Sequence, residues 1–170
     1  TKMQHYRKQQ HFKLKAYSNM IQKLDHKKTV ISEQIRAVFQ ISYAVEAELL
    51  KAVNFPPLQR SLNDFMTSNT AFFGYWKDQE LAAVIEVKRE PSSTHIQSLV
   101  VAPRFFRQGI GSALIEFVLN SYQTKMFTVE TGLANGPATD LYKKFKFQEA
   151  YQYDTDHGIR KIRFQKQLET

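Results

Sequence analysis

Residues 96–114 read IQSLVVAPRFFRQGIGSAL, and this stretch decides how the chain folds. It begins with an apolar, β-branched run that is typical of a buried strand of roughly 5–6 residues. Pro103 ends the run, because proline has no N–H to donate to a neighbouring strand. After a basic turn, apolar residues recur at helical spacing, namely Ile110, Ala113, Leu114, Phe117 and Val118. The stretch therefore predicts a strand, a glycine-bearing turn and a helix.

This combination is a candidate phosphate site. The first N–H groups of a helix have no internal partner and carry the positive end of the helix dipole. Glycine lets an anion approach the backbone closely, and Arg107 adds positive charge. A P-loop is excluded because its Lys-Ser/Thr pair is absent, and a dinucleotide fingerprint because Leu114 replaces its third glycine. The turn suits a single pyrophosphate, although an ordinary strand-to-helix connection would show a similar pattern.

The composition indicates one globular domain in a chain of 170 residues, long enough for a proper hydrophobic core. No apolar run approaches the roughly 18–20 residues of a membrane span, and no signal peptide is recognisable, so we expect no membrane partner and a cytoplasmic location. The absence of cysteine excludes disulfides, thiolate-bound zinc and a cysteine nucleophile. The five histidines show no metal-ligand spacing, so we expect no metal.

The net charge of +8 is concentrated in residues 1–19, which carry five cations and no acid. Removing these five charges leaves +3, so the remaining chain is not unusually basic. We therefore interpret residues 1–19 as a basic N-terminal extension and residues 20–170 as the folded domain. Such an extension could contact nucleic acid or an acidic partner, but charged termini are more often solvated, and we do not expect nucleic acid as a partner.

The remaining periodicities predict strands at 20–24, 71–77, 81–88, 126–131, 147–153 and 159–168. A first helix is expected from Ser32, as N-cap, to about residue 50, and a second over 58–66 with Pro57 in its first turn. A further helix begins at Asn135, its expected N-cap, with Pro137 near the first position. Hairpins mixed with crossover helices argue for an α+β (mixed α/β) domain.

Two segments resemble the GNAT N-acetyltransferase superfamily. One is the strand-turn-helix at 96–118, and the other reads Asn135-x-x-Ala138-x-x-Leu141-Tyr142-Lys143-Lys144-x-x-Phe147. The similarity is most specific over about residues 95–150, and the order of elements supports it from Met20 onward. The resemblance implies a mostly antiparallel, twisted sheet of about seven strands, splayed in the middle and flanked by about four helices.

The resemblance further implies acetyl-CoA, or another acyl-CoA, bound between the strands at 96–102 and 126–131. Its pyrophosphate would lie on the turn, in contact with Arg107, Gln108, Gly109, Ile110, Gly111 and Ser112. Its pantetheine arm would pair with the backbone of Leu99, Val100 and Val101 like an added strand, and Asn135 would contact the same arm. Tyr142 would face the thioester sulfur.

Two positions depart from the family pattern. Phe106 stands where the family's turn has Gln or Arg, which removes one side-chain contact to the cofactor but spares the backbone cradle. Lys146 replaces the glycine that ends the second motif, which affects the corner into the next strand and not the chemistry.

Acetyl transfer to an amine makes three chemical demands. The developing oxyanion needs a donor, for which the N–H of Val100 or Val101 is suited. The leaving thiolate needs stabilisation, which Tyr142 can provide by donating a hydrogen bond, although that residue also fits a core-facing aromatic stripe. The amine must be neutral, although an ordinary lysine-type amine has a pKa of about 10.4, so a carboxylate base is expected.

The identity of the base is open at this point. Glu46 is the leading candidate over Glu48, Glu86 and Glu130, each of which is interpreted first of all as a solvated carboxylate. Tyr43 and Phe55 are candidates to shape the acceptor pocket, and equally for the core.

We therefore expect an N-acetyltransferase that moves an acetyl group from acetyl-CoA to a primary amine by direct attack on the thioester. The alternative is a non-catalytic acyl-CoA-binding sensor, which the departure at Phe106 and the unassigned base would favour. The expected partners are acetyl-CoA and an amine acceptor, with a homodimer left open. The acceptor itself, from a polyamine or amino acid to a peptide, is not specified by the sequence.

Overall fold

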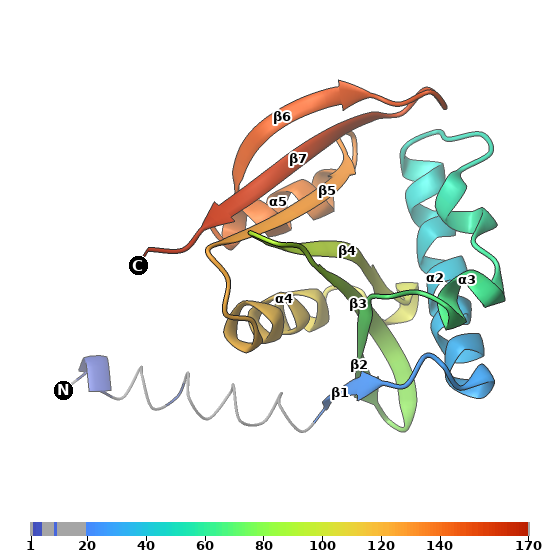
Figure 1. Ribbon diagram of the computed structural model, residues 1–170, viewed down its shortest axis with the longest axis horizontal. Coiled ribbons are helices and arrows are strands. Elements are labelled where there is room, and N and C mark those ends of the chain that lie inside the picture. Colours follow the sequence, from blue (N-terminus) through green and yellow to red (C-terminus); the bar gives the residue numbers. More distant parts are fainter. Residues whose placement is uncertain (1, 5–8, 10–19, 170) are drawn as a thin grey trace.

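A mixed seven-stranded sheet forms the centre of the molecule, in the order β1-β2-β3-β4-β5-β7-β6 (Figure 1). The computed structural model describes residues 2–4, 9 and 20–169. All neighbouring strands are antiparallel except β4 and β5, which are parallel. The strands are β1 (Ile21–Leu24), β2 (Ala71–Lys77), β3 (Glu80–Arg89), β4 (Thr94–Val101), β5 (Met126–Gly132), β6 (Gln148–Asp154) and β7 (Arg160–Gln167). The basic extension predicted at 1–19 lies almost entirely outside the described residues.

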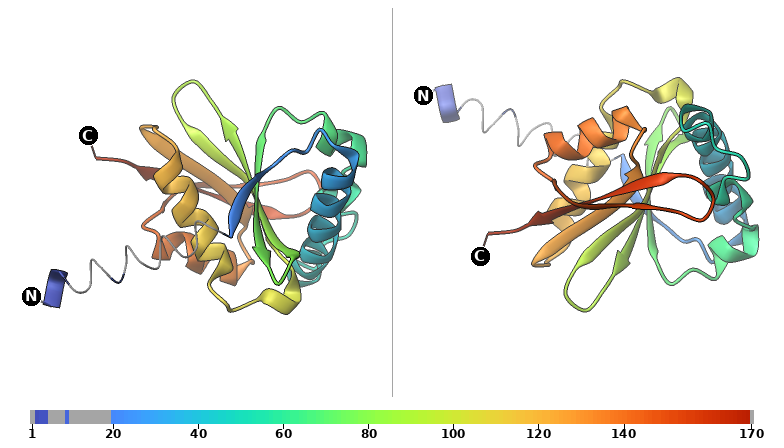
Figure 2. Two further views of the ribbon diagram at one scale, coloured as in Figure 1. Left: turned by 90° about the horizontal axis from the view of Figure 1, so that it is seen from below. Right: turned by 90° about the horizontal axis from the view of Figure 1, so that it is seen from above.

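Between residues 20 and 169, α-helices cover both faces of this sheet (Figure 2). They are α2 (Thr29–Leu49), α3 (Leu62–Met66), α4 (Ile110–Ser121) and α5 (Gly136–Lys144), and short 3-10 helices span Pro56–Gln59 and Pro103–Phe105. Helices α4 and α5 lie on one face and α2 and α3 on the other, each above its own hydrophobic cluster. The predicted α+β class, with a sheet of about seven strands flanked by helices, is confirmed. No helix in the described part of the chain is long and apolar enough to cross a membrane.

The sheet is splayed between β4 and β5. These strands pair only through Thr94–Ile96 and Phe127–Val129, and beyond this point they diverge toward α2 (Figure 1). The cause is visible in the register between β3 and β4, where the partners of Glu86 and Val87 are Ser98 and Ile96. Gln97 is therefore an extra residue in β4, and a bulge of this kind bends the strand that carries it. The predicted splay is present, and it begins at this bulge.

The start of α2 differs from the prediction. The helix begins at Thr29, and its N-cap is Lys28, which makes no side-chain capping bond. Ser32 lies one turn inside the helix and is fully buried, with its hydroxyl donating to the carbonyl oxygen of His26. The predicted capping role of Ser32 is therefore wrong. The helix begins three residues earlier, and the Ser32 hydroxyl forms its hydrogen bond with the backbone of the preceding turn.

The expected single helix at 58–66 is divided into two short elements. Pro56 and Pro57 start a 3-10 helix, and α3 begins only after Ser61. The Ser61 hydroxyl accepts from the N–H of Asp64 at 3.2 Å, and the Asp64 carboxylate accepts from the N–H of Ser61 at 3.4 Å. This reciprocal capping box restarts the helix and sets its boundary.

Candidate active site

Two cavities meet where the sheet is splayed. The first, which we call the aromatic cavity, has a volume of about 500 Å³ and is walled by Phe39, Tyr43 and Phe55. The second, the turn cavity, has a volume of about 490 Å³ and extends over the turn between β4 and α4. The residues that line both cavities are Glu46, Leu99, Asn135, Ala138 and Tyr142. A molecule in one cavity can thus reach a molecule in the other at this junction.

The turn cavity contains a backbone cradle suited to an anion. Arg107 and Gly109 both adopt left-handed backbone conformations, with φ of 60° and 76°. For Arg107 this costs roughly 1–2 kcal/mol, and such strain tends to gather at functional sites. Helix α4 starts immediately afterwards, and no side chain caps its first N–H groups. These groups remain available to a ligand phosphate.

The space above the cradle is open. A Cβ atom added to Gly109 would meet no atom within 4 Å, and one added to Gly111 would only reach ordinary contact with Leu141, at 3.5 Å. Packing within the protein therefore does not require glycine at 111, whereas the close approach of a phosphate would. Ile110 and Ser112 line the same cavity. The turn therefore has the open backbone cradle that a phosphate group requires.

Three side chains around the cradle modify the sequence prediction. Gln108 does not line the turn cavity, and its amide oxygen instead accepts a hydrogen bond from Lys77. Phe106 does line it and is 44% exposed. Lys144, which sequence reasoning missed, donates to the Ser112 hydroxyl at 3.4 Å and brings a second cation to the start of α4. It follows Leu141, which lines the turn cavity, by three residues, and this helical spacing was the signal that could have identified it.

Where β4 no longer pairs with β5, the backbone N–H and C=O groups of every second residue of β4 point into the splay. The N–H of Ala102 donates to Ala82 of β3 at 2.8 Å, and Val100 is opposite Val84. Backbone N–H groups alternate in direction along a strand. The N–H of Val100 therefore points toward β3, whereas the N–H groups of Leu99 and Val101 point toward the splay. Of the three residues predicted to hold a pantetheine arm, these two offer free backbone groups, while Val100 is buried with its side chain on the α2 side.

Tyr142 reaches the junction from α5, which begins as predicted. The Asn135 side chain accepts from the N–H of Ala138 at 3.2 Å, and this bond starts the helix. The Tyr142 ring is 4% exposed and packs against Phe147 with the ring centroids 5.7 Å apart. Burial raises the pKa of the Tyr142 phenol, so its hydroxyl remains protonated at neutral pH and can donate.

Glu46 reaches the same junction from α2. Burial raises the pKa of its carboxyl group, opposed by side-chain hydrogen bonds with Asn135 and Thr131 and by the charge of Lys161. A carboxylate with a raised pKa, open to a cavity, is suited to accept a proton near neutral pH. The structure therefore brings Tyr142 and Glu46, the two predicted catalytic residues, to one place.

Glu86 is not solvated, and that interpretation of it is wrong. It is 1% exposed, and its two oxygens accept from Arg60 at 2.7 and 2.9 Å. Thr70 and Ser98 donate to the same carboxylate at 2.6 and 3.1 Å. The error arises because β3 is covered on both faces, so that even its polar alternate position is enclosed. Ser68 donates a fifth hydrogen bond at 3.4 Å, and with all five made Glu86 is poorly placed to act as a base.

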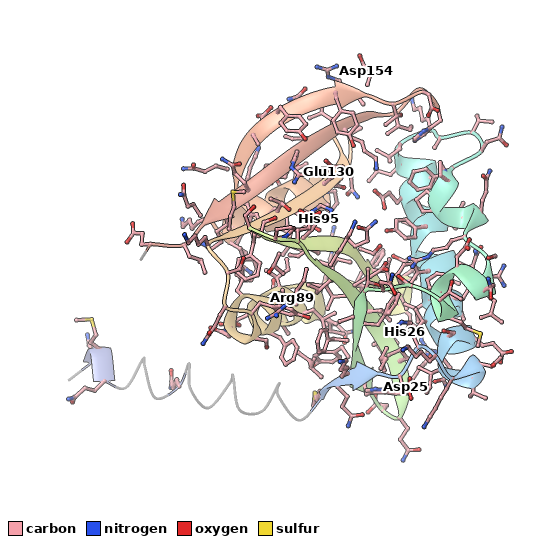
Figure 3. The ribbon with its side chains drawn as sticks, in the orientation of Figure 1. Asp25, His26, Arg89, His95, Glu130 and Asp154 are labelled. Atoms are coloured by element: carbon pink, nitrogen blue, oxygen red, sulfur yellow. The ribbon has the colours of Figure 1, made fainter. Side chains whose placement is uncertain are left out.

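Glu130 is also engaged, and it lies on β5 close to His95 of β4 (Figure 3). It accepts from Arg163 at 3.0 Å and from the Tyr153 hydroxyl at 2.7 Å. Burial would raise its pKa, but these bonds hold the pKa of Glu130 below its ordinary range. Glu48 is exposed and lines neither cavity. Within the described residues no group of three His, Asp or Glu side chains could hold a metal ion.

Comparisons with known proteins agree with this geometry. A sequence model of a family described as the acetyltransferase (GNAT) domain matches residues 41–168. The UPF0157 protein YqkA of Bacillus subtilis (strain 168) is 35% identical over 141 residues, which cover 82% of this chain. The match covers only 41% of YqkA, so the chain spans about two fifths of that relative's length.

Solved acetyltransferase structures share the fold. The ribosomal-protein-S18-alanine N-acetyltransferase of Escherichia coli superposes with a TM-score of 0.69 at 20% identity, over 88% of this chain and 94% of that one. The PaiA N-acetyltransferase of Thermoplasma acidophilum, in complex with coenzyme A, gives 0.67 at 18% identity, over 87% and 98%. A GNAT family acetyltransferase of Elizabethkingia anophelis with acetyl-CoA bound gives 0.55 at 20% identity, over 71% and 88%.

Proposed function

The chain belongs to the GNAT acetyltransferase family, and we propose that it transfers an acetyl group from acetyl-CoA to a primary amine by direct attack of the amine on the thioester. Family membership confirms the resemblance read from residues 95–150. The observation that carries the proposal is the junction of the two cavities, because it joins a cofactor-sized space to a separate acceptor space through Glu46 and Tyr142. The folded domain at 20–170 would carry the whole reaction.

Acetyl-CoA would lie in the turn cavity. The left-handed turn, the free N–H groups of α4 and the cations Arg107 and Lys144 support a pyrophosphate there. The exposed edge of β4 at Leu99 and Val101 supports a pantetheine arm that pairs like an added strand. Asn135 lines both cavities and would border the arm near its end.

The acceptor amine would enter through the aromatic cavity, and each catalytic demand has a residue for it. Glu46 would take a proton from the ammonium group so that the neutral amine attacks the acetyl carbonyl. A backbone N–H on the open edge of β4, from Leu99 or Val101, would donate to the oxyanion. Tyr142 would donate to the departing thiolate. Because its pKa is raised, we assign it hydrogen bonding and not full proton transfer.

Release of coenzyme A tests this proposal directly. The chain has no cysteine, so a thiol reagent would detect only released coenzyme A. With an amine panel, we expect turnover in the wild type and a fall in kcat of about 10–100-fold in Tyr142→Phe, the value of one hydrogen bond to a charged group. Tyr151→Phe, which removes an exposed hydroxyl outside both cavities, is the matched control.

The same assay separates an enzyme from a binding module. A ligand at 100 times its Kd stabilises a protein by about 2.7 kcal/mol, so saturating acetyl-CoA should raise the melting temperature. Stabilisation without release of coenzyme A from any amine would favour the non-catalytic sensor. Neither stabilisation nor release would count against both functions.

A further inference from the structure

The charges that line the aromatic cavity are mostly satisfied within the protein. They are Glu46, Arg60, Asp64, Glu130 and Lys161. Arg60 is held by Glu86 through two hydrogen bonds, and Glu130 is held by Arg163. Asp64 caps its own helix through the N–H of Ser61. Arg60 and Glu130 are therefore ion-paired before any acceptor binds, and the exposed carboxylate of Asp64 is engaged in the capping box of α3.

Glu46 and Lys161 differ from the ion-paired Arg60 and Glu130. In the part of the chain that the structure describes, neither forms an ion pair within 4.0 Å, although the charge of Lys161 acts on the Glu46 carboxyl. Lys161 is half-buried on β7, where it pairs with Gly132 of β5, and both residues line the cavity. The sheet thus holds one ammonium group at the cavity wall, while α2 holds one carboxylate at its junction end.

This pair of unmatched charges is complementary to a ligand that carries one ammonium and one carboxylate. We propose that the acceptor is a free amino acid, whose carboxylate binds Lys161 and whose amine faces Glu46. A polyamine fits less well, because its second cation would meet Lys161. The aromatic walls formed by Phe39, Tyr43 and Phe55 would cover the rest of the acceptor. This inference rests on the proposed acetyl transfer and names its substrate class.

Matched acceptors provide the test. Purified protein is given acetyl-CoA with each L-amino acid and, in parallel, with the corresponding amino-acid amide, which has the same size and amine but no carboxylate. For the amino acid that reacts best, we expect kcat/KM about tenfold or more above that of its amide, as for the loss of one hydrogen bond between charged groups. Faster turnover of the amides would overturn the inference and leave the proposed acetyl transfer intact.

Lys161→Gln separates acceptor binding from a merely electrostatic effect on Glu46. We expect the variant to reduce the preference for acid over amide to about onefold, because kcat/KM falls more on the acid than on the amide, while the KM for acetyl-CoA stays nearly unchanged. Lys88→Gln, which removes an exposed lysine of β3, should retain the wild-type preference. Equal losses on acid and amide in Lys161→Gln would overturn the inference. No release of coenzyme A from any acceptor would instead refute the proposed function beneath it.

Discussion

Glu46 at the junction of the two cavities and Glu86 in β3 show how the surroundings of a carboxylate decide its role. Glu86 is enclosed and accepts hydrogen bonds from Arg60, Thr70 and Ser98, so these bonds fix it as part of the framework. Glu46 is largely buried without an ion pair in the described residues, and burial raises its pKa. The surroundings of Glu86 hold it in place through hydrogen bonds, whereas those of Glu46 favour a group that accepts a proton.

The raised pKa of Glu46 has a consequence for stability. A carboxyl group whose pKa is higher in the folded than in the unfolded protein favours folding at low pH, and this contribution is lost as the pH rises through the folded pKa. We therefore expect Glu46→Gln to increase the melting temperature at pH 7–8, with the difference disappearing below the ordinary glutamate pKa of about 4.3. Differential scanning calorimetry across this range measures it.

Glu48→Gln removes an exposed carboxylate from the same helix and should show no such pH-dependent gain. If Glu46→Gln lowered the melting temperature at pH 7–8, the carboxylate of Glu46 would be stabilising and the direction of its pKa shift would be wrong.

Glu86→Gln should destabilise the fold strongly. Removing one partner of a buried ion pair leaves the other charge without compensation, which typically costs about 3–5 kcal/mol. Here the uncompensated group is Arg60, whose guanidinium lies 4.1 Å from the ring centroid of Phe65. Urea unfolding of Glu86→Gln, Arg60→Gln and the double variant measures the coupling free energy between the two residues. We expect the double variant to lose less stability than the two single variants lose together. Additive losses would show that the pair acts as two independent residues.

At the scale of elements, periodicity in the sequence was a good guide. The alternating strands, the apolar stripe at 110–118 and the cap at Asn135 are all local patterns, and each is found where it was expected. The errors are also physical. Ser32 is a good capping residue, but its hydroxyl is taken up by the backbone of His26, a choice that the sequence near Ser32 does not reveal.

Parts of the candidate site depend on contacts between distant segments. The bulge at Gln97 has no distinctive residue to announce it, yet it opens the splay. Lys161 enters the aromatic cavity only because β7 pairs with β5, and Glu86 is enclosed only because β3 is central. The sequence motifs predicted the side that we assign to the cofactor, whereas the side that we assign to the acceptor depends on the topology.

Gly111→Ala distinguishes a glycine kept for folding from one kept for a ligand. The added Cβ would only reach ordinary contact distance from Leu141, and alanine is favoured over glycine in a helix by about 0.5–1 kcal/mol. We therefore expect unchanged or slightly increased stability in urea, together with weaker acetyl-CoA binding by calorimetry because the methyl group occupies the approach of the pyrophosphate. Gly136→Ala, in the first turn of α5 with open space around it, is the control and should bind normally. Unchanged affinity in Gly111→Ala would place the pyrophosphate elsewhere.

At the scale of the whole molecule, the halves of the sheet on either side of the splay are held together by three residue pairs between β4 and β5. A ligand that lies along β4 and also contacts α5 and β5 would add contacts across this narrow join. The shortest strand pairing of the sheet thus lies beside the proposed binding site, and cofactor binding there should register as a global gain in stability.

This global gain also tests where the functional domain begins. The first described strand starts at Ile21, and all described residues that line either cavity lie at or beyond Phe39. We expect deletion of residues 1–19 to preserve the rise in melting temperature with acetyl-CoA and the rate of coenzyme A release.

The same deletion lowers the net charge from +8 to +3, so any binding to nucleic acid, measured between 50 and 200 mM salt, should weaken with it. Loss of the acetyl-CoA response on deletion would extend the functional domain into residues 1–19, and nucleic-acid binding that survived deletion would assign that property to the folded domain.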